Sequence, residues 1–180
     1  MKRLSCAMLV LVLVLSGVCG ALAVTPITIE TEYLPDYEKG MYAAFIGGCM
    51  VNNIVTGEDA LTPSVETEDD PMTVRFAPLD GVLVDFDFSP GYLFSVSLIL
   101  DTNVEYVQSN ASTLYVVFVT ACSNPEMDSE TVREIMDCLF DNLNYDADYG
   151  ADYADYSTSS ESYILVNSST DVMLSIYPAG

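Results

Sequence analysis

Carboxylates supply most of the reactive side chains in this sequence. Its 180 residues include 27 aspartates and glutamates, five lysines and arginines, and no histidine. Without histidine, the chain cannot perform Ser-His-Asp or Cys-His catalysis, HExxH zinc hydrolysis or imidazole metal binding. It also lacks the GxxxxGK and GxGxxG phosphate-binding motifs. Any chemistry must therefore come from carboxylates or thiols.

Asp85 and Asp87 form the first carboxylate pair. They lie two residues apart in an alternating apolar segment, so a β-strand would point both to the same face. Such a pair can serve glycoside hydrolysis or bind a cation. Alternating acids are more typical of the solvent face of a half-buried strand, which is our main interpretation. A carboxylate-based hydrolase is the less favoured alternative.

The second group of carboxylates lies in residues 145–156, a low-complexity tract that repeats Ala-Asp-Tyr. Asp146, Asp148 and Asp152 have a spacing similar to that of calcium-binding loops. The match to an EF-hand is incomplete, because Ala151 stands where that loop has glycine and Ser157 where it has glutamate. The tract is predicted to be an exposed linker, with calcium binding by these three aspartates as the alternative.

Three cysteines lie beyond residue 23: Cys49, Cys122 and Cys138. An odd number allows at most one internal disulfide. Cys122 and Cys138 are the least favoured pair, since the helix predicted between them would separate them by about 15 Å and bridged Cα atoms lie within about 7 Å. A bridge from Cys49 to either one, or three free thiols, stays open. Asn110 and Asn167 begin N-glycosylation acceptor triplets, both in predicted turns.

The first 23 residues have the layout of a secretory signal peptide. Lys2 and Arg3 precede an uninterrupted apolar run. Ala21 and Ala23 are the two small residues of a small-x-small cleavage pattern. We expect cleavage after Ala23 and secretion or cell-surface exposure. Two alternatives remain: residues 4–24 could stay as a membrane anchor, or Cys19 could be lipidated.

The charge of the remaining chain narrows its partners. Three basic residues face 27 acidic ones beyond residue 23, which gives a net charge of −24. Nucleic acid and anionic membrane surfaces are improbable partners because both require clustered Lys and Arg. An extracellular protein or glycan is the expected partner, and a membrane only if the signal segment is kept as an anchor.

Residues 81–120 organise the predicted fold. Their apolar alternation and their content of Val, Ile, Phe and Tyr predict adjacent β-strands, with 113–121 as a central strand apolar on both faces. Residues 101–112 between them are predicted to form a polar loop. Further strands are predicted at 25–34 and 72–77, and a hairpin at 161–166 and 171–177.

Two helices are predicted to cover this sheet. In residues 128–143 the apolar side chains recur as a single stripe, with Asp128 as the N-cap. Residues 36–55 also show helical spacing, with Asp36 as the N-cap; Gly47 and Gly48 would let this helix approach the sheet, or would instead turn a hairpin. Residues 56–71 are predicted to form an acidic surface loop.

The sequence therefore predicts a signal peptide at 1–23 and one acidic domain at 24–180. Its fold class is α+β, with an antiparallel sheet of about six strands and one or two helices on one face. The leading hypothesis is an exported, non-catalytic interaction or structural module. A calcium-dependent binding module is the alternative, followed by the carboxylate-based hydrolase.

Overall fold

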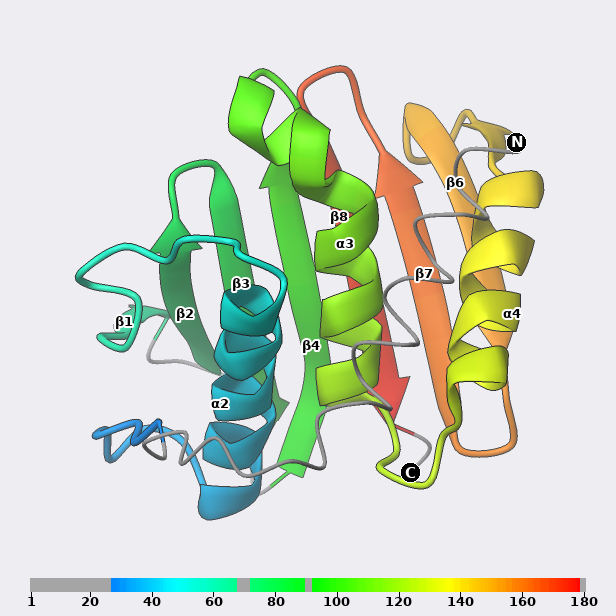
Figure 1. Ribbon diagram of the computed structural model, residues 1–180. Helices are drawn as coiled ribbons and strands as arrows, with labels where there is room; N and C mark the ends of the chain where they lie inside the picture. Colours follow the sequence, from blue (N-terminus) through cyan, green and yellow to red (C-terminus); the bar gives the residue numbers. More distant parts are fainter. Residues whose placement is uncertain (1–26, 68–71, 90–91, 179–180) are drawn as a thin grey trace.

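One antiparallel sheet of eight strands organises the residues that the computed structural model describes, namely 27–67, 72–89 and 92–178. The strand order is β1-β2-β3-β4-β8-β7-β6-β5. All three helices of the described residues lie on one face of this sheet (Figure 1). The predicted α+β class and the antiparallel sheet are confirmed, but the described residues contain eight strands in place of about six and three helices in place of one or two.

The sheet consists of two meanders joined side by side. Strands β1 to β4 follow one another in the first half, strands β5 to β8 do so in the second, and β4 pairs with β8 where the halves meet. The bounds are β1 Ser64–Thr67, β2 Met72–Leu79, β3 Val82–Ser89, β4 Tyr92–Asp101, β5 Asn144–Asp146, β6 Ala151–Ser157, β7 Glu161–Asn167 and β8 Asp171–Pro178.

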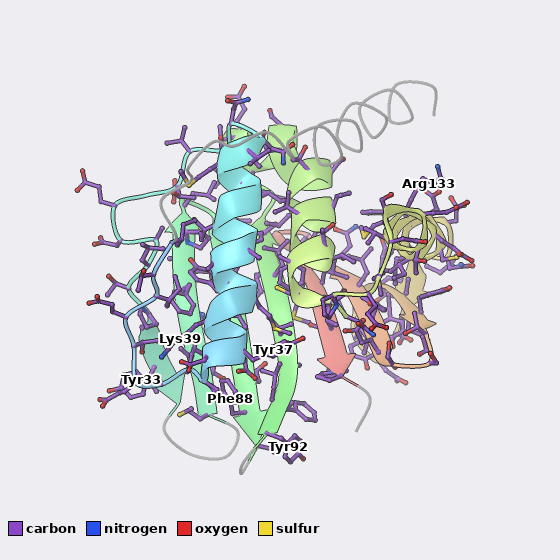
Figure 2. All side chains as sticks on the ribbon, turned by 60° about the horizontal axis from the view of Figure 1, so that its bottom comes forward. Tyr33, Tyr37, Lys39, Phe88, Tyr92 and Arg133 are labelled. Atoms are coloured by element: carbon purple, nitrogen blue, oxygen red, sulfur yellow. The ribbon has the colours of Figure 1, made fainter. Side chains whose placement is uncertain are left out.

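The helices are α2 (Asp36–Val51), α3 (Glu105–Cys122) and α4 (Ser129–Asp141). Figure 2 shows α2 and α3 side by side over the sheet. Helix α4, which carries Arg133, lies on the other side of α3 from α2 (Figure 2) and contacts α3 through Tyr115 and Phe140, whose ring centroids are 5.6 Å apart. Helices α3 and α4 follow β4 in the chain and connect it to β5. The chain thereby passes from the centre of the sheet to its far edge.

The helix starts show one correct and one wrong capping prediction. The Asp128 carboxylate accepts a hydrogen bond from the Thr131 N–H at 2.8 Å, which confirms it as the N-cap of α4. This bond lowers the pKa of Asp128. Asp36 is instead the first residue of α2, and its N-cap is Pro35, which has no side chain able to accept such a bond.

The main core lies between the helices and the sheet. Tyr42 of α2 stacks on Phe76 of β2 with ring centroids 3.9 Å apart, and its hydroxyl donates to the Ala60 carbonyl at 2.5 Å. Phe45 of α2 meets Phe118 of α3 edge to face at 6.1 Å. Aromatic contacts of this kind add to the stabilisation that apolar burial already gives.

Five segment predictions are wrong. Residues 113–121 belong to helix α3 and not to a central strand, and part of the predicted loop 101–112 forms the first turns of the same helix. The predicted linker 145–156 contains most of β5 and most of β6. The described part of the predicted strand 25–34, from Ile27 onward, is not a strand, and β1 lies inside the predicted loop 56–71.

In the described parts of the chain, no helix has the length and apolar character needed to cross a membrane. The predicted signal peptide at 1–23 and its cleavage after Ala23 fall outside these parts.

Candidate functional site

The face of the sheet that the helices leave uncovered is the candidate site. On β3, the side chains of Val82, Val84 and Phe86 are buried in the core against the helices. Because side chains alternate along a strand, Leu83, Asp85 and Asp87 point to the other face. The register of the neighbouring strands extends this division across the sheet.

An uncharged line of large side chains crosses this face. Each member lies directly opposite the next on the neighbouring strand. At a strand spacing of about 4.8 Å, the five strands carry the line over about 19 Å. All five side chains are half-buried. We call this set the apolar row, and it consists of Leu83, Ile99, Met173, Val166 and Tyr153.

A polar row runs beside the apolar row, two residues along each strand. We define it as Arg75, Asp85, Ser97 and Ser175, which lie opposite one another on β2, β3, β4 and β8. Arg75 donates two hydrogen bonds to Asp85, at 2.8 and 2.7 Å. The Ser97 and Ser175 hydroxyls are 2.8 Å apart. Both serines are buried, although no described helix lies over this face (Figure 1).

The polar row corrects the interpretation of the Asp85 and Asp87 pair. Their predicted placement on one face of a strand is confirmed by β3. The predicted solvent exposure is wrong for Asp85, which is only 5% exposed. Asp87 accepts hydrogen bonds from Thr73 at 2.6 Å and from Ser95 at 2.9 Å. Every oxygen of the two carboxylates thus has a donor within the chain, an arrangement suited to joining β2, β3 and β4.

An aromatic pair, Phe94 and Tyr177, completes the face. Strict alternation along β4 would place Phe94 on the same side as Val96, but the ladder between β3 and β4 shifts register between Asp87 and Phe88. Phe94 is 47% exposed and meets Tyr177 edge to face, with ring centroids 5.7 Å apart. Strict alternation could not reveal this, because a bulge adds a residue to one strand of a pair.

The predicted calcium ligands do not form one ligand set in this structure. Asp146 lies opposite Ala151, and Asp152 lies opposite Tyr145, so Asp146 and Asp152 point to opposite faces. Asp148 uses its backbone N–H to donate to the Asp146 carboxylate at 2.8 Å. Within residues 27–67, 72–89 and 92–178, no group of three Cys, Asp or Glu side chains is placed to hold a metal ion. Calcium binding stays a prediction for titration.

The thiols are poorly suited to nucleophilic chemistry. Cys49 and Cys122 are buried, Cys138 is half-buried, and all three are free in the structure. Burial raises the pKa of the Cys49 thiol to about 12. Burial, and then the negative charge of Glu161, also raise the pKa of Cys122. Since the thiolate is the reactive form, both buried cysteines are unreactive near neutral pH.

A buried polar cluster lies on the helix side of β7 and was not predicted. The Tyr163 hydroxyl donates to Glu161 Oε2 at 2.5 Å and lies 3.0 Å from the Ser123 hydroxyl. Burial, followed by the hydrogen bond with Glu161, raises the pKa of Tyr163. Ser123 directly follows α3, so the cluster ties the end of that helix to the sheet.

Comparison of the chain with protein-family models, with curated proteins and with solved structures finds no significant match in any of the three. The class that the structure defines is therefore architectural: an antiparallel α+β fold whose described helices cover only one face of the sheet.

Proposed function

We propose that this protein is an exported, non-catalytic interaction or structural module that binds its partner through the uncovered face of the sheet. One observation carries the proposal. The apolar row crosses five strands without a charge, on a chain whose net charge is −22. Contiguous apolar surface on an otherwise polar protein is typical of an interaction site.

The composition of the face supports a binding role. Interfaces are enriched in Met and aromatic side chains and depleted in charge at their centres. Met173 lies at the middle of the apolar row, Tyr153 at its end, and Phe94 and Tyr177 beside the polar row. The one ion pair described on this face, Arg75 with Asp85, is internally neutralised.

The state of the carboxylates supports a non-catalytic role. A general acid or base must exchange protons with a substrate, and a nucleophilic carboxylate must reach one. The oxygens of Asp85 and Asp87 already accept hydrogen bonds from Arg75, Thr73 and Ser95. Neither calcium binding nor hydrolysis is favoured by a specific contact of the described residues.

Export rests on the signal peptide predicted at residues 1–23. An intact-mass measurement on secreted material tests it, because cleavage after Ala23 gives a chain that begins at Val24. The same spectrum reports glycosylation. Asn110 lies within α3 and not in the predicted turn, whereas Asn167 ends β7 next to the β7–β8 turn.

Site-specific photo-crosslinking tests the binding surface. A photoreactive phenylalanine derivative replaces Met173, and the chain is expressed in its native host so that natural partners are present. Val55, which is 77% exposed in the loop after α2, serves as the control position. We expect a discrete crosslinked species from position 173 and none from position 55. If position 173 gives no more product than position 55, the sheet face is not the binding surface.

A further inference from the structure

We infer that the partner of the uncovered face is a second copy of this chain, so that two sheets pack face to face with their helices outward. The inference rests on the proposed function, because it names the partner of the same surface. It follows from the distribution of charge, from the size of the face and from the way the face matches itself under two-fold symmetry.

The helix layer carries many of the exposed carboxylates. The Asp36 side chain at the start of α2 is fully exposed, and that of Glu130 on α4 is 82% exposed. Asp137 and Asp141 on α4 are exposed as well. A second copy approaching this layer would meet strong repulsion between like charges, and a basic partner would be attracted to it. The apolar row carries no charge, so neither effect acts there, and a surface of the same uncharged kind is its best match.

Face-to-face pairing keeps the acidic layers apart. Two packed sheets lie about 10 Å from each other, and each helix layer adds about 10 Å on the outer side. The carboxylates on the outer helix surfaces of the two copies would thus be separated by roughly 30 Å. The screening length at physiological salt is about 8 Å, so their repulsion would be weak.

The face is large enough for a stable dimer. The six longer strands span about 24 Å at a spacing of about 4.8 Å, and eight residues extend about 27 Å. The footprint is about 650 Å², close to the roughly 800 Å² per partner of a standard interface. The apolar row would form the centre, and Thr73, Asp87 and Ser95 would form part of a polar rim.

The face also complements itself. Consider a two-fold axis that runs across the strands between the apolar row and the polar row. This axis places β4 over the partner's β4, so Ile99 faces the partner's Ser97 and Met173 faces the partner's Ser175. On β4 and β8, large apolar side chains then lie over small ones, in both directions. On β3, Leu83 lies over the partner's Asp85, a carboxylate that is paired with Arg75 of its own chain.

The same axis avoids contacts between like charges. Asp101, in the row beyond the apolar row, would face the partner's Ser95, and Asp87 would face the partner's Gly81. No carboxylate of this face would lie directly opposite another at the positions where β3 and β4 meet their symmetry mates.

Sedimentation velocity of the secreted chain between about 1 and 100 µM tests the inference, since interfaces of standard size have dissociation constants in the micromolar range or below. We expect a dimer. Met173→Asp should weaken dimerisation by at least about 100-fold, because a central charge is introduced twice. Val55→Asp, which adds the same charge outside the face, should leave the dimer unchanged. Ile99→Lys is the second variant, and circular dichroism with a melting curve selects whichever variant is folded.

Salt provides an independent readout. Raising NaCl from about 0.1 to 1 M shortens the screening length from about 10 to 3 Å. An apolar interface between two acidic chains should then tighten, whereas an interface built on ion pairs should weaken. A wild-type chain that stays monomeric at 1 M NaCl, or folded variants that dimerise as well as the wild type, would overturn the inference.

Photo-crosslinking separates this inference from the proposed function. If position 173 crosslinks to a different protein while the chain sediments as a monomer, the sheet face binds a partner but the partner is not a second copy. If position 173 gives no crosslink and the chain is monomeric, both are wrong.

Discussion

Arg75, one of the chain's five basic residues, forms an ion pair with the buried carboxylate of Asp85. The Asp85 side chain is 8% exposed and that of Arg75 is 31% exposed, and the two oxygens of Asp85 each accept from a different guanidinium nitrogen. A buried carboxylate that loses its cation keeps its desolvation cost without the compensating attraction. Loss of Arg75 should therefore destabilise the protein chiefly because it would leave the Asp85 carboxylate buried without a counter-charge.

Arg75→Met should lower the free energy of unfolding by about 3 kcal/mol, at the lower end of the range for a broken buried pair because Arg75 is partly exposed. Urea denaturation measures the change. Adding Asp85→Leu to the same chain should recover most of the loss, since an apolar pair needs no counter-charge. Lys39→Met is the matched control. Lys39 pairs with a fully exposed Asp36 at 3.5 Å, so its loss should leave stability nearly unchanged. An equal effect of the two single substitutions would contradict this account.

The residue types predicted part of this site. Alternation correctly placed Asp85 and Asp87 on one face, because the period of a strand is fixed by backbone geometry. It could not predict that Asp85 is covered and paired, since that depends on the register between β2 and β3, where an irregularity lies between Phe76 and Leu79. Strict alternation would also misplace Phe94, because the neighbouring ladder between β3 and β4 contains a register shift.

At the scale of the elements, α4 was predicted and α3 was not. Helix α4 is amphipathic, and its buried positions Val132, Ile135, Met136 and Leu139 recur at helical spacing. Helix α3 is apolar on most sides near its end, where Leu114, Tyr115, Val117, Phe118 and Val119 are all buried. Because the C-terminal half of α3 is buried around most of its circumference, periodicity cannot distinguish it from a buried strand.

The linker predicted at residues 145–156 was wrong for the opposite reason, because these residues have too little apolar patterning. Its buried positions in β6 are Ala151 and Ala154, and its larger side chains are Tyr153 and Tyr156. A strand whose buried residues are small, and whose other positions are Asp and Tyr, does not show the usual apolar alternation. Its role as a strand depends on pairing with β7, whose residues lie outside the repeat.

The contact between α2 and α3 depends on Gly48. A Cβ atom at this position would lie 2.5 Å from Val117 Cγ1, too close for any real contact. The glycine was predicted to let the helix approach the sheet, but the close neighbour belongs to α3. Gly40, in the same helix, has no such neighbour within 4 Å of its own Cβ position.

Gly48→Ala should therefore destabilise the protein by about 1–3 kcal/mol, because the clash with Val117 outweighs the gain in helix propensity. Gly40→Ala should instead stabilise it by up to about 1 kcal/mol, since nothing opposes that gain. Thermal and urea unfolding of the two variants give this comparison directly. Equal stabilisation by both substitutions would show that α2 and α3 are not closely packed at Gly48.

At the scale of the whole molecule, the sequence predicted the fold class but not the order of the strands. The mixture of strands and helices, and their antiparallel arrangement, followed from patterning. The joining of two meanders by β4 and β8 pairs residues such as Leu98 and Leu174, which lie far apart in the chain. Local propensity carries no information on such a contact. Because α3 was predicted as a strand, the helical connection from β4 to the second meander was not recognised from the sequence.

The net charge of −22 should make the stability of the molecule depend on salt. Repulsion among the carboxylates opposes the compact state, and raising NaCl from about 0.1 to 1 M shortens the range of that repulsion from about 10 to 3 Å. A gain of about 2 kcal/mol would raise the melting temperature by about 4–8 °C for a chain of this size.

The measurement should use the Met173→Asp variant, so that dimer formation does not contribute to the shift. Choline chloride at the same ionic strength should give a similar rise, because screening does not depend on the identity of the cation. Calcium chloride at matched ionic strength then isolates any binding by Asp146, Asp148 and Asp152, and Asp146→Asn with Asp148→Asn should remove an extra rise if one occurs. A melting temperature that stays constant or falls between 0.1 and about 1 M salt would mean that the carboxylates are spaced widely enough for their repulsion not to limit folding.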